Sequence, residues 1–428
     1  MAQIDVLSSK DLMALEDQYG AHNYHPLPVV LSKGEGVFVW DAENKKYYDF
    51  LSAYSAVNQG HCHPRIIQAL KDQAEQLTLT SRAFYNDKLG LYEKYVTEYF
   101  GFDKVLPMNS GAEAVETAIK ICRKWGYEEK GIEENKAVII VCGENFHGRT
   151  TTIISFSSDP DAKGNFGPYT PGFISVPYND IEAIRQTAHE VSGRLAGILV
   201  EPIQGEAGVN VPDAGFIPAI RAICDEANAL FIADEIQTGL ARTGSMLAIC
   251  GECSCEHKCE KAETYITPDI LILGKALSGG TYPVSAVLAN DHVMNVIKPG
   301  QHGSTYGGNP VACAVAMASL DVLYDEKLMQ NARRLGQIFR ERMQALVNQY
   351  NIVSSVRGRG LLNAVVINDS PDSSTAWEIC LIMAENGLLA KPTHGNIIRF
   401  APPLVMTEDQ LHDCCDIIGR SIHQYVNQ

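Results

Sequence analysis

Six short apolar runs in the middle of this 428-residue chain constrain its fold more than any other feature. Helical patterns separate these runs, which lie at 137–143, 172–178, 195–202, 230–235, 269–275 and 283–290. Segments this apolar are typical of strands buried on both faces, which occur in parallel sheets covered by helices. The chain is therefore predicted to contain a large α/β domain with a mostly parallel sheet.

The two ends of the chain show a different pattern. Residues 36–41 and 46–51 alternate between apolar and polar, which predicts an antiparallel hairpin. Beyond residue 309 we expect an α+β region with two long helices up to about 350, strands at 361–367 and 397–401, and helices at about 375–386 and after 407. The hairpin is expected to complete this region, which divides the chain into an N-terminal segment at 1–60, a large domain at 61–309 and a small domain at 310–428. A cleft between two such bodies is a common ligand site.

Charge and local composition exclude several classes of partner. The formal net charge of −16 disfavours nucleic acid and anionic membranes, and no apolar run approaches the roughly 20 residues that span a bilayer. In the first twenty residues acidic side chains outnumber the single Lys10, which fits neither a signal peptide nor a transit peptide. We therefore expect a cytoplasmic protein that acts on small molecules.

Two of the predicted strands end in charged residues that suit catalysis. Lys275 closes the run 269–275 before a Gly-rich turn, and Asp234 follows the run that begins at Leu230. Ligands of α/β sheets bind at the edge where these strands end. Burial would lower the pKa of Lys275 and favour the neutral amine that condenses with an aldehyde, whereas Asp234 can hold a proton on a ring nitrogen. Taken singly, each residue is also compatible with a structural role, as a strand-end lysine or a helix cap.

Two Gly-containing segments are candidate phosphate sites. Ser110, Gly111 and Ala112 lead directly into a helical pattern at 113–125, and a helix N-terminus binds anions through its free N–H groups. Ser304 and Thr305 offer hydroxyl groups in a loop rich in glycine. Either segment is also compatible with an ordinary turn or connector.

A further segment, residues 145–150, follows a predicted strand directly. Phe146 can stack on a flat ring, and Arg149 can bind a carboxylate with its guanidinium fork. His147 either belongs to the same site or is a partly buried turn residue.

The order of these features, with an acid and a lysine at two strand ends between two phosphate sites, resembles the fold-type I, class III aminotransferases. Longer strings are similar to the ornithine aminotransferases of that family, from Tyr19-Gly-Ala-His-Asn-Tyr24 through Glu201-Pro-Ile-Gln-Gly-Glu206 to Ile398-Arg399-Phe-Ala. The resemblance covers nearly the whole chain. It implies an α/β fold with a mostly parallel, seven-stranded sheet and a smaller α+β domain built from both ends of the chain.

The resemblance implies pyridoxal 5′-phosphate as cofactor and assigns residues to its ring. Lys275 would bind the aldehyde and later move the proton on the substrate carbon. Asp234 would pair with the pyridine nitrogen, Gln237 with the ring oxygen, and Phe146 would stack on the ring.

The same resemblance assigns residues to the phosphate group. The backbone N–H groups of Gly111 and Ala112 would hold it, beside Ser110. Thr305, with Ser304 nearby, would reach the phosphate bound in a neighbouring subunit, which implies a homodimer with shared sites.

Substrate roles follow from the resemblance in the same way. The implied reaction moves the δ-amino group of ornithine to 2-oxoglutarate and gives glutamate-5-semialdehyde and glutamate. Arg149 would bind the ornithine carboxylate, Tyr24 would meet the distal amine, and Tyr54 would shape the pocket. Arg399 would bind the second carboxylate of 2-oxoglutarate, and Glu206 would mask it while ornithine is bound. A fixed structural ion pair is the alternative for Glu206 and Arg399.

One stretch departs from the family pattern. Cys250, Cys253, Cys255, His257 and Cys259 lie in what resembles an insertion between the strands of Asp234 and Lys275. These residues are candidates for a zinc site outside the catalytic set or for a strained redox disulfide. A charged surface loop with reduced thiols is equally compatible with the pattern.

Alternative functions differ in specific residues. Acetylornithine and 4-aminobutyrate aminotransferases are the nearest, and Tyr24 with Tyr54 favours ornithine because its free α-amine needs a polar partner. A non-enzymatic, metal-binding relative would lack Lys275 or Asp234, and both are present. A dinucleotide-dependent oxidoreductase is disfavoured because no G-x-G-x-x-G follows a first strand.

Overall fold

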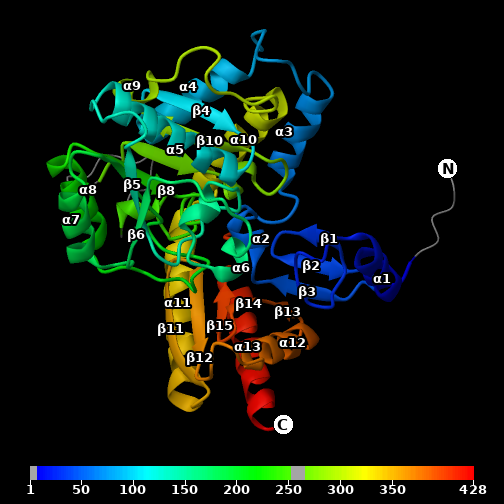
Figure 1. The fold of residues 1–428 in the computed structure, drawn as a ribbon. Helices are drawn as coiled ribbons and strands as arrows, with labels where there is room; N and C mark the ends of the chain where they lie inside the picture. The colour runs from blue at the N-terminus through cyan, green and yellow to red at the C-terminus, as the bar shows by residue number, and fades with distance from the viewer. Residues whose placement is uncertain (1–6, 252–265) are drawn as a thin grey trace.

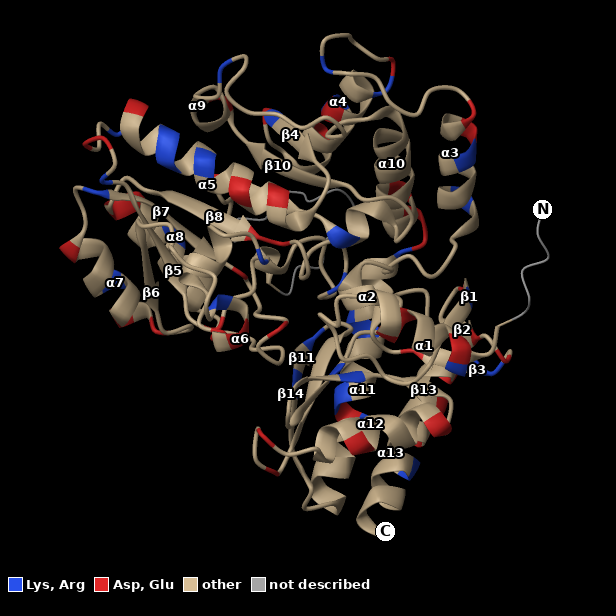
Figure 2. Cartoon of the chain, turned by 45° about the vertical axis from the view of Figure 1, so that its right-hand side comes forward, with Lys and Arg blue, Asp and Glu red and all other residues tan. Residues whose placement is uncertain are grey.

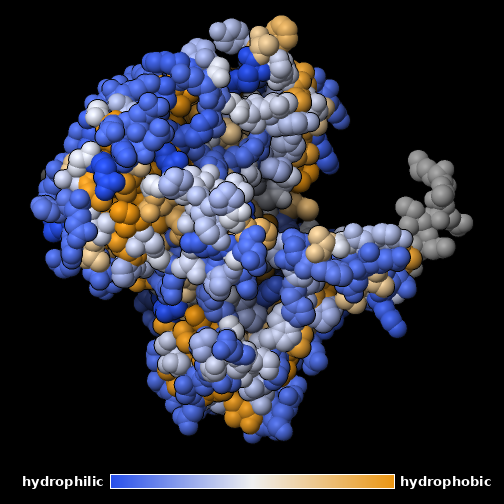
Figure 3. All heavy atoms as spheres, viewed as in Figure 1, coloured by the Kyte–Doolittle hydropathy of each residue, from blue (hydrophilic) through white to orange (hydrophobic). Residues whose placement is uncertain are grey.

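The computed structural model describes residues 7–251 and 266–428 (Figure 1). Figure 1 shows a large α/β body, a smaller body around helix α11, and an N-terminal sheet that projects to one side. The space-filling view in Figure 3 shows a mostly hydrophilic face with scattered apolar patches. No helix within the described ranges is long and apolar enough to cross a membrane.

The large body is built on a seven-stranded sheet in the order β4-β10-β9-β8-β7-β5-β6. Strands β9, β8, β7, β5 and β6 are parallel, and β10 is antiparallel to both of its neighbours. The mostly parallel sheet and its six predicted strands are confirmed. The strands are β4 (Lys104–Met108), β5 (Val138–Cys142), β6 (Phe173–Val176), β7 (Leu195–Val200), β8 (Leu230–Asp234), β9 (Ile270–Leu273) and β10 (Ser285–Ala289).

Helices cover both faces of this sheet because its central strands are apolar on both sides. Alternate residues of β5 enter different cores, Ile139 and Val141 on the face of α5, and Val138 and Ile140 on the face of α7 and α8. The helices of this body are α3 (Pro64–Ala74), α4 (Leu89–Phe100), α5 (Gly111–Glu128), α6 (Pro160–Lys163), α7 (Ile181–Glu190), α8 (Phe216–Glu226), α9 (Asp291–Met294) and α10 (Pro310–Asp325).

The small body contains a four-stranded antiparallel sheet in the order β11-β12-β15-β14. The helices expected after residue 310 are present, but the first of them, α10, packs against α3 and α4 of the large body, so the small body begins at α11 rather than at residue 310. The elements are α11 (Leu328–Gln349), β11 (Val353–Arg359), β12 (Leu362–Ile367), α12 (Thr375–Glu385), β13 (Leu388–Leu389), β14 (Lys391–His394), β15 (Ile397–Phe400) and α13 (Glu408–Val426).

The N-terminal segment forms the predicted hairpin and one strand more. Helix α1 (Ser9–Tyr19) precedes the antiparallel strands β1 (Leu31–Glu35), β2 (Phe38–Asp41) and β3 (Lys46–Asp49). Strand β3 pairs in parallel with β13, so this segment does return to the C-terminal part of the chain. A short turn, α2 (Ser52–Ser55), then leads into the large body.

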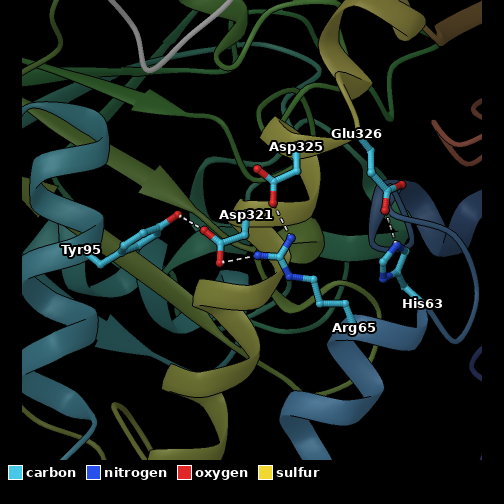
Figure 4. A network of polar contacts seen from close by, with 6 residues as sticks. All are labelled: His63, Arg65, Tyr95, Asp321, Asp325 and Glu326. Carbon is cyan, nitrogen blue, oxygen red and sulfur yellow. Dashed lines mark hydrogen bonds and ion pairs between the residues drawn. The ribbon is translucent and has the colours of Figure 1, made fainter.

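Figure 2 shows positions of Lys and Arg and of Asp and Glu along helices of the large body, such as α3 and α5. Ion pairs between such residues join α3 to α10. Figure 4 shows Arg65 of α3 between Asp321 and Asp325 of α10, and the Tyr95 hydroxyl of α4 donates to Asp321 at 2.6 Å. These pairs are largely exposed, so each contributes little to stability.

One local expectation needs correction. Lys275 does not end a strand, because β9 stops at Leu273 and Lys275 begins a 3-10 turn, Lys275–Ser278. Its backbone adopts a φ of 44°, in the left-handed region. The turn bends the chain sharply, and the carbonyl of Ala276 accepts a hydrogen bond from the Gln59 side chain at 3.0 Å.

Candidate active site

A cavity of about 200 Å³ opens where the strands of the large sheet end. Residues from several strand ends and from the start of α5 share its walls. Those predicted from the sequence are Gly111, Ala112, Phe146, Glu206, Asp234, Gln237 and Lys275. The structure therefore brings together, in one cavity, residues that lie up to about 160 positions apart in the chain.

Lys275 is the only lysine in the described wall of this cavity. Burial lowers the pKa of its amine, and the nearby Glu206 and Asp234 act in the opposite direction. The lowered pKa favours the neutral form, which can attack a carbonyl carbon. Gln59, itself fully buried, donates to the carbonyls of Ala276 and Ser319 and so fixes the turn that carries Lys275.

In the cavity wall, Asp234 is buried and paired with His147. The Asp234 carboxylate lies 2.6 Å from His147 Nδ1 and also accepts the N–H of Ile236 at 3.0 Å. Burial alone would lower the pKa of His147, but the hydrogen bond and charge of Asp234 raise it overall. The pair keeps Asp234 in a fixed orientation toward the cavity, and His147 is fully buried rather than a partly buried turn residue.

Glu201 is a cavity residue that the sequence analysis did not single out. It follows directly on β7, is buried, and accepts the backbone N–H of Phe146 at 3.1 Å. Burial raises the pKa of its carboxyl to about 7, although His147 lowers it. The signal was present in the sequence, because an acid directly after a buried strand is the same pattern that identified Asp234.

The start of α5 forms one wall of the cavity. Ser110 caps the helix, its hydroxyl accepting the N–H of Glu113, whose carboxylate accepts the N–H of Ser110. Gly111 and Ala112 are the first two helical residues, whose N–H groups have no acceptor within the helix itself. These two amides and the helix dipole suit an anion.

At the other end of the cavity, Arg399 and Glu206 form an ion pair. The guanidinium Nη1 lies 2.7 Å from Glu206 Oε1, and Gln237 donates to the same oxygen at 2.9 Å. Burial would raise the pKa of Glu206, but Arg399 and Lys275 outweigh it and bring it to about 2. Arg399 also lies over the ring of Tyr54, 5.0 Å from its centroid. Glu206 is therefore ionised at neutral pH and neutralises a buried cation.

Seven of the predicted residues do not line this cavity, namely Ser110, Ser304, Thr305, Tyr24, Tyr54, Arg149 and Arg399. Ser110 caps the helix beside it, and Arg399 with Tyr54 lies against Glu206 of its wall. Arg149 is exposed, 5.8 Å from the centre of the Phe146 ring, and Tyr24 is 71% exposed. Thr305 is exposed as well, and Ser304 accepts a hydrogen bond from Asn109 Nδ2 at 2.7 Å. Their assigned roles stay predictions.

The Cys-rich stretch falls mostly outside the described residues, which include Cys250 but not Cys253, Cys255, His257 or Cys259. Within 7–251 and 266–428 there is no group of three or more His, Cys, Asp or Glu that could hold a metal ion.

The residues of the cavity fit a phosphorylated aromatic aldehyde. Lys275 offers a weakly basic amine, Asp234 a buried carboxylate, and α5 two outward amides. Among the described groups, the buried Gln237 Oε1 has no hydrogen-bond partner, so it can accept from a ring hydroxyl.

Comparisons with known proteins agree with this geometry. Residues 19–422 match the model of the aminotransferase class-III family. A Drosophila melanogaster protein named mitochondrial ornithine aminotransferase is 58% identical, over 97% of this chain and 92% of that protein. A structure named acetylornithine aminotransferase from Elizabethkingia anophelis is 59% identical, with a TM-score of 0.88 over 98% of this chain and 100% of that one. The ornithine aminotransferase structure of Toxoplasma gondii is 46% identical, with a TM-score of 0.93 over 98% and 96%. The chain belongs to the class-III aminotransferases.

Proposed function

We propose that this protein is an ornithine aminotransferase that moves the δ-amino group of ornithine to 2-oxoglutarate with the help of pyridoxal phosphate. The observation that carries the proposal is the Glu206–Arg399 pair in contact with the cavity of Lys275. While paired, Arg399 is neutralised and the site suits a substrate with one carboxylate. When Glu206 turns away, the free guanidinium suits the second carboxylate of a diacid.

Bound pyridoxal phosphate would supply an electron sink for the bond changes at the substrate carbon. Lys275 would hold its aldehyde carbon, Asp234 would keep a proton on the ring nitrogen, and Gln237 would accept from the ring hydroxyl. The His147 partner orients Asp234 for this task. The amides of Gly111 and Ala112 would hold the phosphate.

The protein's own residues account for the proton chemistry. Lys275 is buried, and its lowered pKa favours the neutral amine, which would be able to take a proton from the substrate carbon and return it elsewhere. Phe146 covers one side of the cavity, which limits access of water to the reacting atoms.

We further propose that the active unit is a homodimer. Ser304 and Thr305 lie outside the cavity of their own chain, and the exposed aromatic residues Phe84, Tyr85 and Tyr306 support an apolar contact surface. Mixing the inactive variants Lys275→Ala and Thr305→Ala tests this, because a mixed dimer regains one complete site. Recovery of activity on mixing is expected, and no recovery would contradict shared sites.

The cofactor assignment predicts that the purified protein is yellow and that Lys275→Ala loses turnover by many orders of magnitude. The reason is that no other lysine of the described cavity wall can replace it. Absorption spectra and a transaminase assay check both statements, with Lys94→Ala on the exposed face of α4 as control. A wild-type protein that stays colourless with added pyridoxal phosphate would refute the assignment.

Acetylornithine aminotransferase is the second candidate, because one relative 59% identical to this chain carries that name. Ornithine, acetylornithine and 4-aminobutyrate are to be assayed side by side with 2-oxoglutarate. We expect the highest kcat/KM for ornithine, and a higher value for acetylornithine would favour the second candidate.

A further inference from the structure

Residues 52–55 form a left-handed turn made entirely of non-glycine residues. The φ angles of Ser52, Ala53, Tyr54 and Ser55 are 49°, 46°, 59° and 71°. L-amino acids adopt this region singly and seldom in succession, because Cβ approaches the following carbonyl. Four in a row therefore require neighbouring groups that hold the turn in place, and such turns gather at functional sites.

Asp49 holds this turn from the end of β3. Its Oδ1 accepts the backbone N–H groups of Leu51 and Ser52 at 2.8 and 2.9 Å, and its Oδ2 lies 2.7 Å from His61 Nε2. Asp49 is 8% exposed, so these bonds are shielded from water. His61 is fixed in turn by backbone bonds to Gly36 in both directions.

The turn places Tyr54 against Arg399, the ion-pair partner of Glu206 in the cavity wall. The guanidinium carbon of Arg399 lies 5.0 Å from the Tyr54 ring centroid, within the range of a cation–π contact. Arg399 is 2% exposed, and it also donates to the Glu206 carboxylate at 2.7 Å and to the Gly205 carbonyl at 3.3 Å. A right-handed turn would direct the Tyr54 side chain elsewhere, since side-chain direction follows backbone handedness.

We propose that Asp49, supported by His61, is a positioning residue for substrate choice. It touches neither substrate nor cofactor cavity, and it acts by holding the left-handed turn that places Tyr54 on Arg399. Tyr54 then keeps the guanidinium in position for a second carboxylate when Glu206 releases it. The inference rests on the proposed function, since it assigns a role within the handling of the diacid.

The test compares Asp49→Ala and Asp49→Asn in two backgrounds, the natural sequence and Tyr54→Ala. In the natural background Asp49→Ala is expected to weaken binding of glutarate, an unreactive diacid, to the holoenzyme by about tenfold, as loss of a buried cation–π contact would. Asp49→Asn should stay close to wild type, because its amide oxygen still accepts both backbone N–H groups. In the Tyr54→Ala background neither change should alter glutarate binding. Calorimetry measures the binding, and the KM for 2-oxoglutarate should rise in parallel while kcat is little affected.

His63→Gln is the matched control, because His63 forms a similar pair with the half-exposed Glu326 at 2.8 Å (Figure 4), and among the described residues no hydrogen bond joins either of them to the turn at 52–55. It should leave glutarate binding unchanged. If Asp49→Ala does not fold, His61→Gln replaces it, with a smaller loss expected in the same direction.

Equal losses in both backgrounds, or no loss in either, would overturn the positioning role. Failure of the proposed function has a different signature, namely a wild-type enzyme that does not use ornithine. Glutarate binding can still be compared in that case.

Discussion

At the scale of single residues, burial and neighbouring charges give two carboxyl groups of the cavity wall opposite pKa shifts. Glu201 and Glu206 both line the cavity, yet burial raises the pKa of Glu201 to about 7, whereas Arg399 and Lys275 overcome burial and bring Glu206 to about 2. Burial penalises both charges. Glu206 offsets the penalty through a direct ion pair with Arg399, whereas the effect of His147 on Glu201 is opposed by the charge of Asp234.

Replacing Glu206 by Gln is expected to leave Arg399 permanently unmasked. The kcat/KM for ornithine should fall by about tenfold, because a buried charge loses its partner, and the KM for 2-oxoglutarate should decrease. Since the pKa of Glu206 is near 2, the pair does not titrate between pH 5 and 9, so the effect of Glu206→Gln on the ratio of the two half-reactions should be the same throughout that range. Rapid-mixing measurements of each half-reaction check this, with Glu182→Gln on the surface of α7 as control.

The sequence predicted those site residues whose position follows from the sheet alone. Asp234 lies at a strand end, Lys275 lies just beyond one, and Gly111 starts a helix, so strand and helix boundaries suffice to bring them together. The burial of His147 depends on a contact across 87 residues, which no local pattern contains. Arg149 lies outside the cavity wall. Its predicted role is to bind a substrate carboxylate, and the fold alone does not define the position of that carboxylate.

At the scale of elements, the strands that the sequence did not predict are sheet edges. β1, β4, β11, β13 and β14 each lie at the end of a sheet order. An edge strand has one neighbour and tolerates Pro, Gly and charge, as Pro107 in β4 and Gly358 in β11 illustrate. The central strands of the large sheet are apolar on both faces, and their sequences identify them for that reason.

A second element-scale feature is the turn after β8, which a buried carboxyl holds. Glu235 accepts from the Thr238 hydroxyl and from the N–H of Ile249 at 2.8 Å, and burial raises its pKa from 4.5 to about 7. The Glu235 carboxyl therefore loses its proton at lower pH in the unfolded chain than in the folded protein. The free energy of unfolding consequently falls as the pH rises from about 4.5 to about 7.

Glu235→Gln is expected to remove that pH dependence, because an amide does not titrate and still accepts the Ile249 N–H. The free energy of unfolding of the variant minus that of wild type should therefore increase by up to about 3 kcal/mol from pH 5 to pH 8. Urea unfolding at both pH values measures this, and a constant difference would contradict the buried-acid account.

At the scale of the whole molecule, Arg242 joins three parts of the chain. It is fully buried, donates to Asn58 Oδ1 at 2.6 Å, and donates to the carbonyls of Leu361 and Pro402 at 2.9 and 2.6 Å. Burial lowers the pKa of its guanidinium to about 9. The Arg242 guanidinium, carried by the large body, therefore links the N-terminal segment to the small body through its hydrogen bonds.

Arg242→Lys should destabilise the protein by about 3 kcal/mol or more, since a single ammonium cannot reach all these acceptors and leaves buried carbonyls unpaired. Thermal unfolding monitored by circular dichroism measures the loss. Arg185→Lys in the exposed pair with Glu226 is the control and should change stability by less than about 0.5 kcal/mol.

The pairing of β3 with β13 has a consequence for synthesis on the ribosome. The Lys45 ammonium bonds to the carbonyl of Ala384, 339 residues further along the chain. At the usual elongation rate, the N-terminal hairpin waits roughly 20 to 70 s for its partner strand to be translated. During that interval the edge of β3 is an open template for other nascent chains. Fusing the hairpin behind residue 428 by circular permutation would shorten this wait and should raise the soluble yield.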